Sequence, residues 1–115
     1  MGEWKQVDDF AYGERIANYI RWPLLGVLLL FNPEKTVRPP SNPAMPVPVH
    51  GAQGPGHACF KAAAVDMDAW RGHLEEKGIA IEADFRWPNG ARSIYFRDPA
   101  GNSIEIAEPR IWGLA

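Results

Sequence analysis

The second half of the chain carries first a strand-like and then a helix-like pattern of apolar positions. Residues 57–65, HACFKAAAV, alternate apolar and polar positions closely enough to predict a strand. Three apolar residues then recur at helical spacing: Met67, Trp70 and Leu74. Asp66 suits the N-cap of this helix, and Gly78 suits its C-terminal end. The segment therefore predicts a strand followed by an amphipathic helix.

Three further strands are predicted after this helix. Residues 79–85, 92–97 and 103–107 have the alternation and the β-branched or aromatic residues typical of strands. The first two are separated by WPNG at 87–90, and the last two by DPAGN at 98–102, both rich in turn-forming residues. The predicted order of elements from residue 57 onward is β-α-β-β-β.

The first 32 residues have a less regular pattern. Residues 27–31 form a short apolar run that predicts a buried strand, and 15–22 predict a strand that enters a hairpin. A helix over 9–22 is the alternative, although Gly13 would weaken it by about 1 kcal/mol relative to Ala. The pattern favours three strands over residues 3–31.

Proline dominates the segment between these two regions. Residues 33–56 hold seven of the eleven prolines, and proline fixes φ and removes a backbone donor, so neither helix nor central strand is expected there. We therefore predict one domain over residues 1–115 that has four parts: a shortened first module (1–32), a Pro-rich linker loop (33–56), a complete βαβββ module (57–109) and a C-terminal tail (110–115).

Composition excludes several classes of protein. The 115 residues are 46% hydrophobic and 23% charged, as in an ordinary globular protein, and the net charge of −2 gives no basic surface for nucleic acid. The longest apolar run, 23–31, is too short for a membrane span. Cys59 is the one cysteine, so an internal disulfide is excluded and a cytoplasmic location is expected.

Three stretches together resemble the vicinal oxygen chelate superfamily, which includes glyoxalase I, fosfomycin-resistance thiol transferases, bleomycin-binding proteins and ring-cleaving dioxygenases. They are GPGHACF, AVDMDAWRGHLEEKGI and RSIYFRDPAGNSIEI, and the resemblance covers residues 54–109. It implies an α+β fold in which βαβββ modules form a curved, mostly antiparallel sheet around a cleft. Here the first module is expected to be shortened, without its first strand and helix.

The resemblance also implies a metal site. His57 matches a metal-ligating histidine that opens the second module, and Glu105 matches a carboxylate on the last strand that serves as metal ligand and catalytic group. In the strand 103–107, Glu105 lies on the opposite face from Ile104 and Ile106, which we expect to pack on the helix. The alternatives are a solvated Glu105 and a His57 that is hydrogen-bonded only to backbone.

Three further residues are candidates for contact with a substrate. Ser93 and Tyr95 match positions that contact substrate in the fosfomycin-resistance enzymes of this superfamily. Cys59 lies two residues beyond His57, and thus on the same strand face. For Cys59 a buried thiol that packs as a small hydrophobic group is the default expectation, and for Tyr95 a core position with its hydroxyl at the edge is the alternative.

The chain departs from the superfamily pattern in its first module. The ligand carried by the first strand is expected to be missing, and Leu29 occupies the position where some members place a fourth ligand. Any bound divalent metal, whether Fe, Mn, Ni, Co or Zn, should therefore be weakly held or absent. A third ligand would come from a partner subunit or from water, and a homodimer is expected because the shortened module would leave a sheet edge uncovered.

Three functions remain open from the sequence. The first is a metal-assisted enzyme, a lyase, thiol transferase or dioxygenase that acts on a small molecule with neighbouring oxygens. The second is a non-catalytic module that binds a small molecule through an aromatic cleft, which the five Trp, five Phe and three Tyr residues favour. The third is a shortened family member without activity.

Overall fold

The computed structural model describes residues 3–6, 16–22 and 26–114, with side chains from residue 29 onward. The chain divides into two compact units, Met1–Gln53 and Gly54–Ala115. In the part of the chain that is described, the helices are too short and too polar to cross a membrane.

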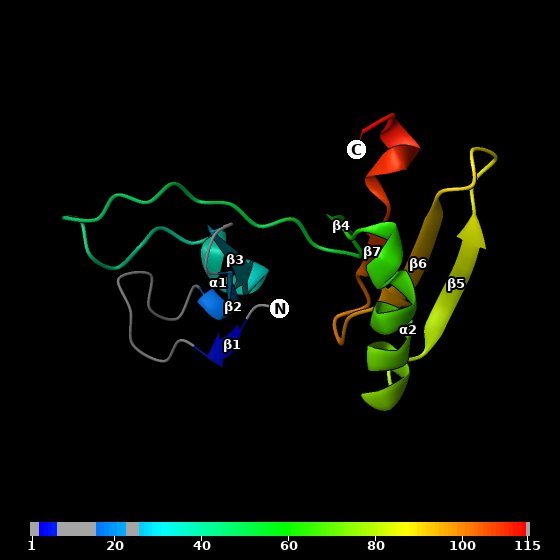
Figure 1. The fold of residues 1–115 in the computed structure, drawn as a ribbon. Coiled ribbons are helices and arrows are strands. Elements are labelled where there is room, and N and C mark those ends of the chain that lie inside the picture. The colour runs from blue at the N-terminus through cyan, green and yellow to red at the C-terminus, as the bar shows by residue number, and fades with distance from the viewer. Residues whose placement is uncertain (1–2, 7–15, 23–25, 115) are drawn as a thin grey trace. The chain divides into compact units, whose positions relative to one another are not determined.

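The first unit contains a three-stranded antiparallel sheet. Its strands are β1 (Glu3–Gln6), β2 (Ile16–Trp22) and β3 (Gly26–Phe31), arranged in the order β1-β2-β3 (Figure 1). The prediction of three strands is confirmed. The alternative helix is wrong over β2, and the remainder of that prediction, residues 9–15, lies outside the described residues.

One turn of helix, α1 (Pro33–Thr36), lies inside the segment predicted to contain no helix. Asn32 is its N-cap, and the Asn32 side chain accepts a hydrogen bond from the Glu34 backbone N–H at 3.0 Å. Proline is tolerated at the first helical position because its missing N–H has no intrahelical partner there. The prediction of no helix is therefore wrong over Pro33–Thr36. Residues 37–56 contain neither helix nor strand, as expected.

The second unit has the predicted β-α-β-β-β order. Its main elements are β4 (His57–Lys61), α2 (Met67–Glu76), β5 (Ile81–Arg86), β6 (Arg92–Arg97) and β7 (Ser103–Ala107). Short 3-10 turns precede α2 at Ala64–Asp66 and follow β7 at Pro109–Trp112. The strand order is β4-β7-β6-β5, with β4 parallel to β7 and the other pairs antiparallel (Figure 1).

Two predicted strand ends differ from the structure because of turn chemistry. β4 ends at Lys61 and not at residue 65, because the chain enters a 3-10 turn over Ala64–Asp66. β5 begins at Ile81, because Ile79 closes α2: its N–H donates to the Leu74 carbonyl at 2.9 Å. This bond and the positive φ of Gly78 form a Schellman cap, which uses Ile79, a residue that was assigned to the strand.

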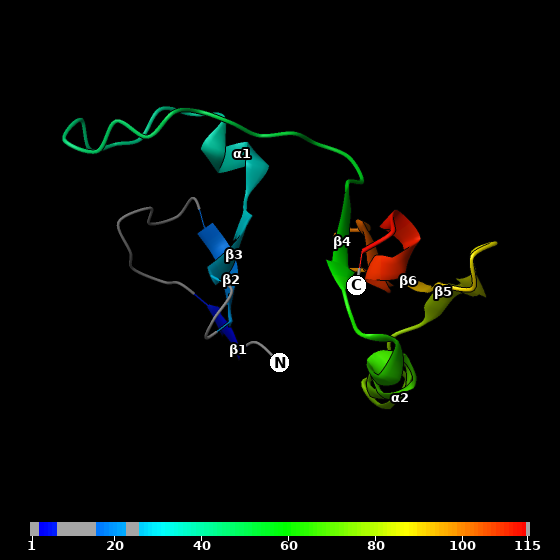
Figure 2. The same cartoon turned by 45° about the horizontal axis from the view of Figure 1, so that its top comes forward.

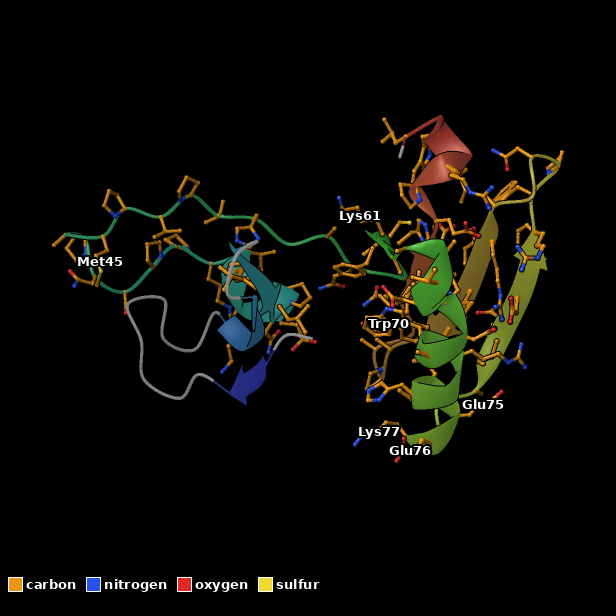
Figure 3. All side chains as sticks on the ribbon, in the orientation of Figure 1. Met45, Lys61, Trp70, Glu75, Glu76 and Lys77 are labelled. Carbon is orange, nitrogen blue, oxygen red and sulfur yellow. The ribbon has the colours of Figure 1, made fainter. Side chains whose placement is uncertain are left out.

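The core of the second unit lies between α2 and one face of the sheet (Figure 2). Its fully or nearly fully buried members are Ala62, Met67, Leu74, Ile94 and Ile106. Trp70 packs against this cluster from α2, whereas Glu76 and Lys77 extend from the far end of the helix into solvent (Figure 3). Because side chains alternate along a strand, the residues beside Ile94 and Ile106 belong to the opposite face.

An ionic network fastens α2 to the sheet. Arg92 of β6 donates two hydrogen bonds of 2.7 Å to Asp84 of β5, one to each carboxylate oxygen. Arg71 of α2 also donates to Asp84, and Asp68 of α2 accepts from Arg92 at 2.6 Å. The hydrogen bonds from Arg92 are the largest cause that lowers the pKa of Asp84 to about 2.

Candidate functional site

Glu105 occupies the centre of β7, on the face of the sheet that α2 does not cover. Cys59 of β4 lies opposite Glu105 on one side, and Tyr95 of β6 lies opposite it on the other. Glu105 is 6% exposed, so it is not the solvated strand residue that the sequence left as an alternative. Ile106, its neighbour along the strand, belongs to the core on the helix side as expected, and Ile104 is half-buried.

The two oxygens of the Glu105 carboxylate have different partners. The Ser93 hydroxyl donates to Oε1 at 2.7 Å, and Ser93 is fully buried. Oε2 lies 3.1 Å from Nε2 of His57, whose side chain is 49% exposed. One oxygen is thus held from inside the protein, and the other lies beside an accessible imidazole.

The contact of the second ring nitrogen of His57 fixes the orientation of the imidazole ring. Nδ1 of His57 lies 3.1 Å from the backbone carbonyl oxygen of Ser103. A carbonyl oxygen only accepts, so we assign the N–H to Nδ1, which donates to Ser103. The Glu105 carboxylate beside Nε2 also only accepts, so without a metal a hydrogen on Nε2 would lie between the two atoms, and a metal ion would take the place of that hydrogen. Metal-binding histidines commonly have this arrangement, with the remote N–H held by a carbonyl or a carboxylate.

The surroundings of Glu105 favour its ionised form. Burial alone raises the pKa of the Glu105 carboxyl group, since it penalises the charge. The Ser93 hydroxyl and, after it, Tyr95, Cys59 and His57 stabilise the carboxylate, and together they hold the pKa below its ordinary value. Glu105 is therefore a charged acceptor at neutral pH.

Cys59 and Tyr95 flank this carboxylate in their protonated forms. Cys59 is exposed, so the expectation of a buried thiol is wrong. Partial burial, followed by the nearby Glu105 charge, raises the pKa of Cys59 to about 11. Burial, followed by a hydrogen bond to Glu105 and then by its charge, raises the pKa of Tyr95 to about 12. Both side chains are hydrogen-bond donors at neutral pH.

A row of rings continues from His57 across the same face. The Tyr95 ring lies nearly parallel to the His57 ring at 6.1 Å between centroids, and nearly parallel to the Phe85 ring at 6.0 Å. Phe85 in turn contacts Trp87 at 4.9 Å. A shallow hollow of about 280 Å³ adjoins the row, and its lining includes Phe85, Tyr95 and Arg97. Glu82 also lines the hollow and accepts from Arg97 at 2.7 Å, so the face combines apolar ring surface with an ion pair.

The structure adds Trp87, which the sequence indicated only as part of a turn. Its indole Nε1 donates to the Ser93 hydroxyl oxygen at 2.8 Å. No spacing rule links a tryptophan in WPNG to a serine one strand later, so only the folded hairpin reveals the contact. Ser93 itself lies behind Glu105, and a direct contact between Ser93 and a ligand stays a prediction that its complete burial does not favour.

Comparison with known families shows which family the chain belongs to. Residues 23–106 match the model of a family described as the Glyoxalase/Bleomycin resistance protein/Dioxygenase superfamily. The chain belongs to this superfamily. The resemblance inferred from the sequence is confirmed, and so is the expected α+β fold.

Solved structures of the superfamily agree with this assignment. A lactoylglutathione lyase from Agrobacterium tumefaciens is 42% identical, with a TM-score of 0.74 and an alignment that covers 84% of this chain and 71% of that one. A superfamily member from Sphaerobacter thermophilus (20% identity, TM-score 0.58, 93% and 77% covered) shares the fold. So does the fosfomycin resistance protein FosX from Mesorhizobium loti (17%, 0.52, 93% and 70%). No curated protein matches the chain.

Metal dependence is common in this superfamily, and a divalent ion requires donors at a fixed spacing. Two donors about 2.1 Å from one ion, at nearly a right angle, are about 3.0 Å apart. The 3.1 Å between Nε2 of His57 and Oε2 of Glu105 fits this spacing. Among the described side chains, no cluster of three His, Cys, Asp or Glu residues suits a metal. The pair therefore fits two positions of a coordination shell and leaves the others to further donors.

Proposed function

We propose that this protein binds a small, oxygen-bearing molecule on the Glu105 face of the second unit, with His57 and Glu105 as two ligands of a divalent metal ion. The observation that carries the proposal is the 3.1 Å approach of Nε2 to a carboxylate whose other oxygen is held by buried Ser93. Imidazole and carboxylate suit Fe, Mn, Ni, Co and Zn alike, so the identity of the ion is left to experiment.

The contacts around the pair support this role. The carbonyl of Ser103 keeps an N–H of His57 on Nδ1, so Nε2 is the nitrogen that would bind a metal ion in place of its hydrogen. Ser93 keeps Glu105 Oε1 occupied, so Oε2 is the oxygen available for coordination. Polarisation of a substrate oxygen is the chemistry that a divalent ion supplies when bound at such a pair.

The substrate class follows from the 42% identical relative. That protein is a lactoylglutathione lyase, so we propose lactoylglutathione, or a molecule that shares its oxygen-bearing group, as the first ligand to test. The hollow beside Tyr95 contains the ion pair of Arg97 and Glu82, which would offer hydrogen bonds to a polar end of the ligand. Tyr95 and Cys59 hydrogen-bond to Glu105, so they would border a ligand bound beside that carboxylate.

A non-catalytic binding module is the second candidate. The row of rings from His57 through Tyr95 and Phe85 favours it, because aromatic surface binds planar ligands without any metal. In that case the His57–Glu105 pair would orient Tyr95 and coordinate nothing. The two candidates therefore differ in whether ligand binding depends on metal.

The test compares metal-free protein with protein reloaded separately with Fe(II), Mn, Ni, Co or Zn, all purified without a histidine tag. Binding of lactoylglutathione is measured by calorimetry, and its conversion is measured by chromatography. The enzyme proposal predicts conversion with at least one ion and none without metal. Tight binding without metal and no conversion with any ion would favour the binding module and contradict the enzyme.

A further inference from the structure

We propose that Trp87 is a positioning residue that fixes the direction of the Glu105 carboxylate through Ser93. The inference deepens the proposed function and rests on it for its consequence at the metal ligands. It starts from two consecutive contacts: Trp87 Nε1 to Ser93 Oγ at 2.8 Å, and Ser93 Oγ to Glu105 Oε1 at 2.7 Å.

The chemistry of the three groups sets the direction of both hydrogen bonds. An indole N–H only donates, so Trp87 gives its hydrogen to the Ser93 oxygen. Ser93 has a single hydroxyl hydrogen, and the ionised Glu105 only accepts. The Ser93 hydrogen therefore points to Glu105 Oε1. Trp87 completes this series of hydrogen bonds. Its N–H occupies a lone pair of the Ser93 oxygen, so the hydroxyl hydrogen of Ser93 points toward the carboxylate.

The two hydrogen bonds lie inside the protein, where they can orient the Glu105 carboxylate. Ser93 is fully buried and Glu105 is 6% exposed, so water competes little for the hydroxyl or for Oε1. With Oε1 held, Oε2 is left beside Nε2 of His57 at 3.1 Å. Without the indole, Ser93 would lose the N–H that donates to its oxygen, and the carboxylate would rotate more freely. Outer partners of this kind typically tune metal affinity about 10–100-fold.

Trp87 also suits substitution, because its ring and its N–H make separate contacts. The ring packs against Phe85 at 4.9 Å between centroids, and the residue is 36% exposed. Trp87→Phe keeps an aromatic ring beside Phe85 and removes the donor together with part of the ring volume, a loss that Trp112→Phe shares. Trp112→Phe is the matched control, because Trp112 lies on the 3-10 turn after β7 and is 55% exposed.

The first experiment needs no metal. The indole N–H resonance of Trp87, identified by its loss in Trp87→Phe, is recorded in wild-type, Glu105→Gln and Ser93→Ala proteins that keep the wild-type circular dichroism spectrum. Positioning through Ser93 predicts that the resonance moves in both variants, because each changes the hydroxyl that accepts from the indole. An unchanged resonance in Glu105→Gln would overturn the proposal, since Trp87 would then not be coupled to the carboxylate.

The second experiment measures Ni²⁺ affinity by calorimetry in wild type, Trp87→Phe, Ser93→Ala and the double variant. Trp87→Phe is expected to weaken binding about tenfold, Ser93→Ala at least as much, and the double variant no more than Ser93→Ala alone. Trp112→Phe should bind as wild type does. Additive losses, or no loss in Trp87→Phe, would overturn the proposal. If wild type binds no Ni²⁺, the proposed function fails, and the resonance experiment still decides the role of Trp87.

Discussion

Cys59 lies directly opposite Glu105 in the parallel pair of β4 and β7, so an exposed thiol shares its face with a buried, ionised carboxylate. Nucleophilic cysteines usually lie beside positive charges, which favour the thiolate. Here partial burial and then the Glu105 charge act in the other direction and raise the pKa of Cys59 to about 11. The site therefore holds a thiol donor and not a nucleophile.

The first prediction follows from this pairing. At pH 7.5, iodoacetamide should alkylate Cys59 roughly 100-fold more slowly in the folded protein than in urea, because two pKa units separate the thiol from its ordinary value. Glu105→Gln should accelerate the folded-state reaction, since loss of the negative charge lowers the thiol pKa. Mass spectrometry over time measures both rates. Equal rates in folded and unfolded protein would contradict the account.

The second prediction concerns the ionic network of Asp84. Its folded pKa is lowered to about 2 by Arg92 and Arg71, against an ordinary value of 3.8. A lowered folded pKa contributes stability above pH 3.8, and this stability is lost as pH falls toward 2. Asp84→Asn should therefore lower the free energy of unfolding by about 2 kcal/mol at pH 7 and by little at pH 2.

Urea unfolding followed by circular dichroism measures this difference. Glu75→Gln is the control, because the Arg71–Glu75 pair is exposed on both sides and is expected to contribute less than about 1 kcal/mol. If Asp84→Asn lowers the free energy of unfolding equally at pH 7 and pH 2, the carboxylate charge is not what stabilises the contact.

The third prediction uses two glycines of the α2 region. Gly72 lies inside α2 with open space where a Cβ would be added, so Gly72→Ala should stabilise the protein by up to about 1 kcal/mol. Gly78 also has open space, but its φ is +71°, so Gly78→Ala should destabilise by about 1 kcal/mol through backbone strain alone. Thermal unfolding of the two variants tests the assigned cap, and shifts of the same sign would contradict it.

The fourth prediction is a homodimer. The pair His57–Glu105 fills two coordination positions, and a partner subunit is one source of the rest. Static light scattering at tens of micromolar protein should give a mass twice the 12.8 kDa of one chain. A mass of one chain at that concentration would remove the partner subunit as the source of a donor.

Local patterns predicted most of the second unit, because its periodicities and turn residues agree with one another. β6 and β7 begin and end where the alternation placed them, and Gly78 ends α2 as expected. The errors lie where a cap or a 3-10 turn takes residues from a strand, as at Ile79. Such turns depend on the closing geometry of the chain, which apolar spacing does not encode.

The candidate site was predictable only in part, for a related reason. Strand alternation placed Glu105 on the face away from Ile106, and the family resemblance paired it with His57. The burial of Ser93 and its bond from Trp87 depend on how the β5–β6 hairpin folds back. Contacts between side chains on different strands leave no periodic signal, so this part of the site could not be predicted from the sequence.

The central claim is that His57 and Glu105 bind one divalent ion, and calorimetric titration of the untagged protein with Ni²⁺, Mn²⁺, Zn²⁺ and Fe²⁺ tests it most directly. Two protein ligands predict one site per chain with an affinity no tighter than micromolar. The variants His57→Ala and Glu105→Gln should each abolish binding, whereas the control His73→Ala, on α2, should bind as wild type does. Binding that survives both site substitutions, or no binding by the wild-type protein, would contradict the claim.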